Sequence, residues 1–86
     1  MTSIFTKIIH REIPANVVYE DEQCIAIYDI APKAKTHILI IPKKEIATVD
    51  DIISEDTLLM GHLFQVAKLI AQEKNISGAY KLQCNV

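Results

Sequence analysis

The spacing of apolar and polar positions in the first third of the chain predicts a short helix and a hairpin. Residues 4–9 carry apolar side chains at helical spacing, and we expect this helix to end before Pro14, because the residue preceding a proline avoids helical backbone angles. Residues 17–20 and 24–29 are rich in strand-forming side chains and flank the polar stretch 21–23. They predict two antiparallel strands joined by a short turn.

The remaining apolar segments predict two further strands and a long helix between them. Residues 37–41 are apolar after the first position, which predicts a strand buried on both faces at the centre of the sheet. Ser54 is suited to cap the long helix, whose core face is expected to carry Leu59, Leu63, Val66, Ala67 and Ile70. Residues 80–86 alternate and predict a last strand that packs on the helix through Tyr80, Leu82, Cys84 and Val86.

Together these elements predict the α+β class: an antiparallel sheet with a short amino-terminal helix and one long helix packed on it. The 86 residues contain no repeat and no linker, so we expect one small domain or part of one. A last strand that no turn follows leaves an unpaired sheet edge, which proteins normally cover. We therefore expect the fold to be incomplete at its carboxyl end.

Composition and charge exclude several classes of function. Nine basic against eleven acidic residues give a net charge of -2, which argues against a nucleic-acid partner. Two glycines are too few for a glycine-rich phosphate loop. No apolar run approaches the roughly 18 residues that span a bilayer, so we expect no membrane association. With only Cys24 and Cys84, both expected to be buried, we predict a reduced, cytoplasmic setting.

The residues that carry chemistry are few and scattered. His10, His37 and His62 lie too far apart in sequence to predict a metal cluster or a proton relay, so we expect no metal, no cofactor and no catalytic histidine. We interpret His10 as a surface residue and His37 as a hydrogen-bonded structural one. Asp29 follows an apolar strand, where its carboxylate is placed either to accept two hydrogen bonds from a sugar diol or to stabilise a turn.

Several stretches resemble the histidine triad (HIT) family, close to its adenosine phosphoramidase branch. The most specific are AIYDIAP at residues 26–32 and THILIIPKK at residues 36–44, and the likeness extends from residues 4–9 to residues 80–85. The resemblance implies a homodimer that binds purine nucleotides such as AMP. It also implies cleavage of a phosphoramidate or a phosphoanhydride through a covalent histidine intermediate.

The resemblance further implies a role for particular residues. Asp29 would hold the ribose hydroxyls and Asn85 would help position the phosphate, while the base would lie against five apolar residues: Ile4, Phe5, Ile8, Ile27 and Ile30. The sequence ends before the His-x-His-x-His strand that names the family, and Glu45 stands where the family usually has another histidine.

These departures lead to two hypotheses. In the first, residues 1–86 are the amino-terminal part of a HIT domain, with half of the nucleotide pocket and no catalysis by themselves. In the second, the chain is a non-catalytic interaction module that forms dimers or strand-swapped oligomers through its unpaired edge.

Overall fold

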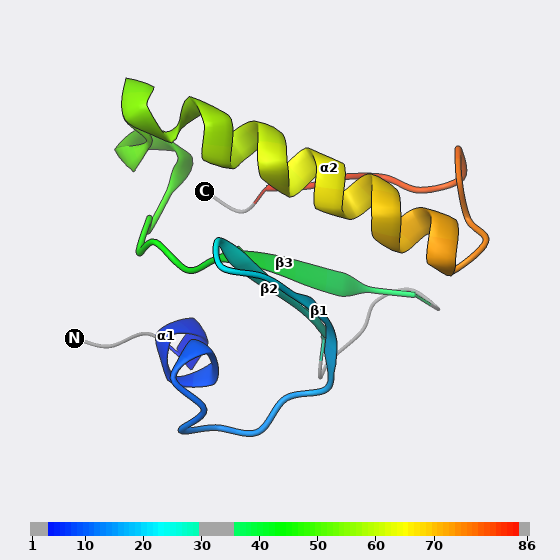
Figure 1. The fold of residues 1–86 in the computed structure, drawn as a ribbon, viewed down its shortest axis with the longest axis horizontal. Coiled ribbons are helices and arrows are strands. Elements are labelled where there is room, and N and C mark those ends of the chain that lie inside the picture. The colour runs from blue at the N-terminus through cyan, green and yellow to red at the C-terminus, as the bar shows by residue number, and fades with distance from the viewer. Residues whose placement is uncertain (1–3, 30–35, 85–86) are drawn as a thin grey trace. The chain divides into compact units, whose positions relative to one another are not determined.

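Residues 4–29 and 36–84 are described in the computed structural model (Figure 1). The chain forms two compact units, Met1–Glu45 and Ile46–Val86. Among the residues described, no helix combines the length and the apolar character needed to cross a bilayer. The first unit holds a short helix and a sheet, and the second holds the long helix.

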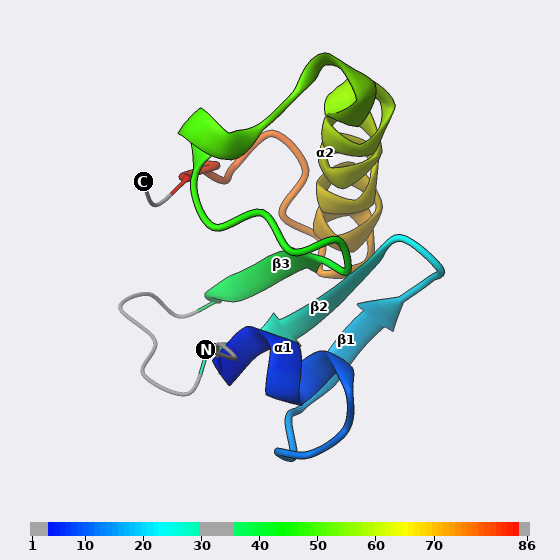
Figure 2. The same ribbon diagram turned by 90° about the vertical axis from the view of Figure 1, so that its left-hand side faces the viewer.

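The first unit contains α1 (Ile4–Ile9) and a sheet of β1 (Val17–Glu20), β2 (Cys24–Tyr28) and β3 (Ile38–Pro42). The strands are antiparallel in the order β1-β2-β3, as Figure 2 shows. This confirms the predicted hairpin. The register of β1 shifts between Val17 and Tyr19, which marks a bulge beside its partner.

The predicted place of β3 at the centre of the sheet is wrong for the sheet that the described residues form. In the three-stranded sheet β3 lies at one edge and is half-buried along its whole length, whereas four of the five residues of β2 are fully buried. An apolar run shows that both faces of a strand tolerate burial, but the order of strands is set by backbone pairing, which hydrophobicity does not report.

One face of the sheet carries the core of the first unit. Ile25 and Ile27 point to the same side of β2 because side chains alternate along a strand, and α1 contributes Ile8 to the same cluster. Partly buried side chains extend this core: Ile9, Ile13, Ala15, Leu39 and Ile41. The helical spacing of residues 4–9 therefore serves to cover the Ile25 and Ile27 face.

A left-handed residue ends α1. Arg11 has a φ of 65°, and the amide of Glu12 donates to the carbonyl of Lys7 at 2.8 Å while the amide of Arg11 donates to Ile8 at 3.1 Å. These two bonds form a Schellman motif, in which glycine is the usual left-handed residue. The guanidinium of Arg11 also lies 2.7 Å from the carboxylate of Glu20. The helix thus stops well before Pro14.

The second unit starts with two short 3-10 turns, η1 (Val49–Asp51) and η2 (Ser54–Asp56), followed by α2 (Thr57–Glu73). The predicted cap is wrong by two residues: Asp56 is the N-cap and the helix begins at Thr57, whose hydroxyl donates to the carbonyl of Ser54 at 2.7 Å. The carboxylate of Asp56 accepts from the amide of Ile53 at 3.1 Å and is almost fully buried. Asp56 therefore closes η2 immediately before the long helix begins.

The predicted core face of α2 is confirmed. Its fully buried residues are Val66, Ala67, Ile70 and Ala71, and Leu59 and Leu63 are half-buried. The helix ends on a second Schellman motif, with Asn75 at a φ of 58° and the amide of Ile76 donating to Ala71 at 2.9 Å. Gly78, at a φ of 75°, belongs to the turn that follows.

The last predicted strand is not formed in the described residues 80–84, which have no regular secondary structure. Tyr80, Leu82 and Cys84 are exposed, so the expected packing of these three side chains, and the expected burial of Cys84, are wrong. Alternation predicts which side chains share a face, but a strand forms only where its backbone groups find a partner.

Candidate functional site

Asp29 follows the carboxyl end of β2 and belongs to the face of the sheet that α1 covers. Side chains alternate along a strand, so Asp29 shares a face with Ile25 and Ile27. Its side chain is 21% exposed. A carboxylate is therefore placed at the end of a rigid, buried strand, beside the apolar cluster that contains Ile8.

The partner of Asp29 is His37, the residue directly opposite it across the hairpin. Tyr28 pairs with Ile38 in the ladder, which brings the next two residues outward face to face. The amide of Asp29 donates to the carbonyl of His37 at 3.0 Å, and the imidazole Nδ1 lies 3.2 Å from the carboxylate Oδ2. The interpretation of His37 as a hydrogen-bonded residue is confirmed. Asp29 is tied to a neighbouring strand in the manner of a turn-stabilising residue.

Two adjacent hollows open along the segment that connects α1 to β1. The first, of about 150 Å³, is lined by Ile8, Arg11, Ile13, Pro14, Ala15 and Val17. The second, of about 220 Å³, is lined by Pro14, Ala15, Asn16, Tyr28 and Asp29. Because they share Pro14 and Ala15, a hollow lined mostly by apolar residues continues into one that is lined by Asp29.

The residues expected to line the base pocket fall into three groups. Ile8 and Ile27 lie together in the core, with exposures of 8% and 3%, and Ile8 lines the first hollow. Ile4 and Phe5 are on the first turn of α1 with exposures of 51% and 42%. Ile30 lies outside the described residues, as does Asn85, which was expected to position the phosphate rather than the base.

The sequence reasoning missed Asn16 and Tyr28, which line the second hollow beside Asp29. The carbonyl of Asn16 accepts from the amide of Tyr28 at 3.1 Å, one residue before β1 begins. The predicted hairpin was sufficient to place Asn16 near Tyr28, because an antiparallel pair places the start of one strand beside the end of the other.

Two basic residues near the strand ends, Arg11 and Lys43, form ion pairs with the same carboxylate, that of Glu20. Glu20 accepts from Arg11 at 2.7 Å and from Lys43 at 2.9 Å. The hydrogen bond from the Lys43 ammonium is the main cause that lowers the pKa of Glu20, and the charge of Arg11 adds to it. Lys43 thus ties the end of β3 to the end of β1. Glu45 accepts from the buried hydroxyl of Thr6 at 2.8 Å, which connects α1 to the chain beyond β3.

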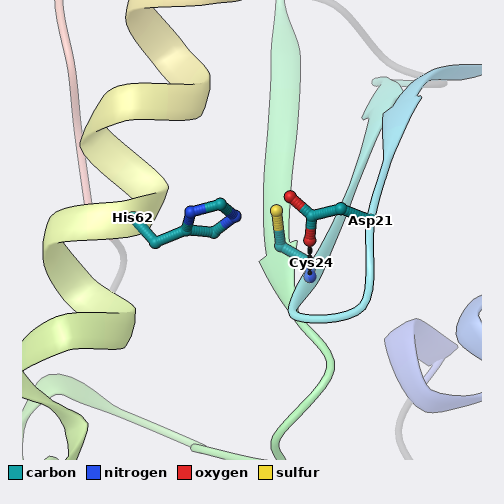
Figure 3. A group of neighbouring side chains, drawn as sticks. All are labelled: Asp21, Cys24 and His62. Atoms are coloured by element: carbon teal, nitrogen blue, oxygen red, sulfur yellow. Dashed lines mark hydrogen bonds between the residues drawn. The ribbon is translucent and has the colours of Figure 1, made fainter.

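The turn between β1 and β2 is organised by one carboxylate. Asp21 accepts hydrogen bonds from the hydroxyl of Tyr19 at 2.8 Å and from the amides of Gln23 and Cys24 at 2.7 and 2.9 Å. Figure 3 shows the Asp21 carboxylate beside Cys24. The hydrogen bond with Asp21 is the main cause that raises the pKa of Tyr19.

Cys24 is fully buried, as predicted. Burial, followed by the charge of Asp21, raises the pKa of its thiol to about 11. Because the thiolate is the reactive form, this cysteine is not suited to act as a nucleophile.

Comparison with known proteins identifies the family. Residues 2–86 match the family model described as scavenger mRNA decapping enzyme C-term binding. An uncharacterized HIT-like protein of Synechococcus elongatus is 46% identical over 83 residues, which are 96% of this chain and 73% of the relative. The chain belongs to the HIT family. An uncharacterized HIT-like protein of Synechocystis is 45% identical with the same shares covered.

Solved structures of HIT proteins share the fold. A HIT family hydrolase from Clostridium thermocellum superposes with a TM-score of 0.91 at 39% identity, over 96% of this chain and 73% of that one. A HIT family hydrolase from Legionella pneumophila gives 0.86 at 46% identity, over 88% and 68%. The predicted fold class is therefore confirmed: this HIT chain has an antiparallel sheet, a short helix and a long helix.

Proposed function

We propose that this HIT chain binds a purine nucleoside monophosphate through its first unit, and that Asp29 holds the ribose hydroxyls. The observation that carries the proposal is that Asp29, at the end of β2, lines the second hollow. An ionised carboxylate offers two oxygens that accept hydrogen bonds, which suits a cis diol. Asn16 and Tyr28, two further residues with polar side chains, line the same hollow.

The apolar residues of α1 support a place for the base. Ile4 and Phe5 are exposed on its first turn, and Ile8 lines the hollow that adjoins that of Asp29. Burial of a flat aromatic base against such side chains stabilises a complex by roughly 25 cal/mol for each Å² of apolar surface removed from water. We assign Ile27 and Ile30 to the same base site, and Asn85 to the phosphate, on the resemblance alone.

Calorimetric titration of the 86-residue chain with AMP tests the proposal. Asp29→Ala is expected to weaken binding by on the order of tenfold or more, since hydrogen bonds to a charged group contribute about 1.5–3 kcal/mol. Asp50→Ala, which removes an exposed acid of η1, is the matched control and is expected to bind as the parent does. Absence of AMP binding, or equal affinity of the Asp29 and Asp50 variants, contradicts the proposal.

We also propose that these 86 residues bind nucleotide without turning it over, in a reducing cytoplasmic setting. No His-x-His-x-His sequence occurs in them, and both cysteines are free thiols. Incubation with an adenosine 5'-phosphoramidate is expected to release no AMP, which chromatography of the reaction measures. Clear turnover that survives removal of contaminating enzymes argues for a nucleophile among the residues present.

A second proposal is self-association. Two large apolar side chains of α2 are strongly exposed, Leu58 at 86% and Phe64 at 60%, and β3 is an edge strand in the described sheet. Exposed apolar surface and an open strand edge both favour contact with another chain. The partner we propose is a second copy of the chain.

A further inference from the structure

We infer that His37 is a positioning residue, which orients the Asp29 carboxylate for the ribose. The inference deepens the proposed function and rests on it. Its basis is the imidazole Nδ1, which lies 3.2 Å from Oδ2 of Asp29. In this inference His37 acts on the ligand through the Asp29 carboxylate.

The register of β2 and β3 places Asp29 directly opposite His37. Five consecutive residue pairs join β2 to β3 without a shift, from Cys24 with Pro42 to Tyr28 with Ile38. The next pair outward is Asp29 with His37, and its backbone bond of 3.0 Å continues the ladder. Directly opposite residues place their Cβ atoms roughly 4.5–5.5 Å apart on one face. An imidazole there meets the carboxylate across the strands.

Asp29 and His37 have different surroundings, which assigns them different roles in the proposed site. Asp29 is 21% exposed and lines the second hollow, together with Pro14, Ala15, Asn16 and Tyr28. His37 is 34% exposed and is not among the described residues that line it. Asp29 therefore borders the hollow proposed for the ligand, while the imidazole of His37 contacts the Asp29 carboxylate.

The chemistry of the pair is compatible with simultaneous ligand binding. When Nδ1 carries the proton, it donates to one carboxylate oxygen and limits rotation of the group. A carboxylate offers about four lone-pair sites, so an oxygen that accepts from His37 still has a site for a hydroxyl. An orienting partner of this kind reduces the freedom that the carboxylate loses when the diol binds.

The test compares AMP with 2',3'-dideoxyadenosine monophosphate, which lacks the diol, by calorimetry on the 86-residue chain. The parent is expected to prefer AMP by on the order of tenfold. His37→Asn keeps an amide nitrogen at the place of Nδ1 and is expected to retain the preference. His37→Gln moves that nitrogen one bond further out and, like His37→Ala, is expected to lose most of it. Affinity for the dideoxy nucleotide is expected to stay unchanged throughout.

Controls separate this inference from the proposed function. His10→Ala removes an exposed histidine of the same unit and is expected to behave as the parent. The double variant Asp29→Ala with His37→Ala is expected to match Asp29→Ala alone. Failure of the parent to prefer AMP overturns the ribose role of Asp29, and this inference with it. If the parent prefers AMP, and His37→Gln and His37→Ala prefer it to the same extent, the inference about His37 is overturned while the proposed role of Asp29 stands. Equal loss of affinity for both nucleotides assigns His37 a structural role and also overturns it.

Discussion

The two cysteines occupy opposite surroundings. Cys24 is fully buried in the middle strand, and the combined effect of burial and Asp21 raises its thiol pKa to about 11. Cys84 is exposed in the irregular segment after α2. Alkylating reagents need both an accessible sulfur and a thiolate, and Cys24 offers neither in the folded chain.

We expect iodoacetamide to modify Cys84 and leave Cys24 intact in the folded protein. The raised pKa alone lowers the thiolate fraction of Cys24 by on the order of 100-fold relative to an ordinary thiol, and burial lowers its rate further. Peptide mass spectrometry after a timed reaction measures both sites. In urea the two cysteines are expected to react at similar rates, which serves as the control. Rapid labelling of Cys24 without denaturant contradicts this description.

At the scale of the elements, ion pairs between charged side chains connect the segments at one end of the sheet. Glu20, at the end of β1, contacts both Arg11 after α1 and Lys43 after β3. The amide of Lys43 also donates to the carbonyl of Gln23 at 2.8 Å. Glu20 thereby connects three segments that are separated in sequence.

The stability of the first unit is expected to fall on acidification in a way that depends on Glu20. Its folded pKa is lowered, so its contribution is complete above the ordinary range of a glutamate and is lost as pH falls through the lowered value. Glu20→Gln is expected to cost about 1 kcal/mol or less near neutral pH and nothing at low pH, because such exposed pairs are weak. Urea unfolding from about pH 7 to about pH 3 measures this. Glu22→Gln is the control, and parallel curves for parent and Glu20→Gln contradict it.

Local pattern predicted the elements whose partners are close in sequence. The hairpin follows from two strand-forming runs around Asp21, and the face of α2 follows from the spacing of Val66 and Ile70. The place of β3 and the state of residues 80–84 depend on which backbones pair, and alternation does not contain that information.

The candidate site was predictable to the same extent. The position of Asp29 after a strand indicated a carboxylate that either binds a diol or stabilises a turn, but its contact with His37 depends on register. The hollow beside it depends on how Asn16 returns next to Tyr28. Contacts across strands require the fold before they can be named.

At the scale of the whole molecule, exposed apolar surface is the feature that bears on assembly. Leu58 and Phe64 lie on α2 with most of their side chains accessible. Large apolar groups placed on a regular helix are suited to pack against another such surface, because a rigid helix loses little freedom on association.

We expect multi-angle light scattering to give a mass above that of the 9.7 kDa chain, and the mass to fall on dilution. Leu58→Ser or Phe64→Ser is expected to weaken self-association roughly 10- to 100-fold, since burying one such side chain contributes about 1.5–3 kcal/mol. Lys68→Ser, at an exposed position of the same helix, is the control. A monomer mass at every concentration contradicts the second proposal.

The left-handed backbone conformation of Arg11 affects which substitutions this position tolerates during evolution. Glycine at this position would relax a backbone conformation that costs other residues roughly 1–2 kcal/mol, but it would remove the cation that contacts Glu20. This gain is offset by loss of the ion pair, which contributes about 1 kcal/mol or less, and by the greater freedom that glycine loses on folding, roughly 0.5–1 kcal/mol. Arginine and glycine are therefore nearly equivalent for stability here, so selection on folding alone leaves the position open to neutral exchange between them.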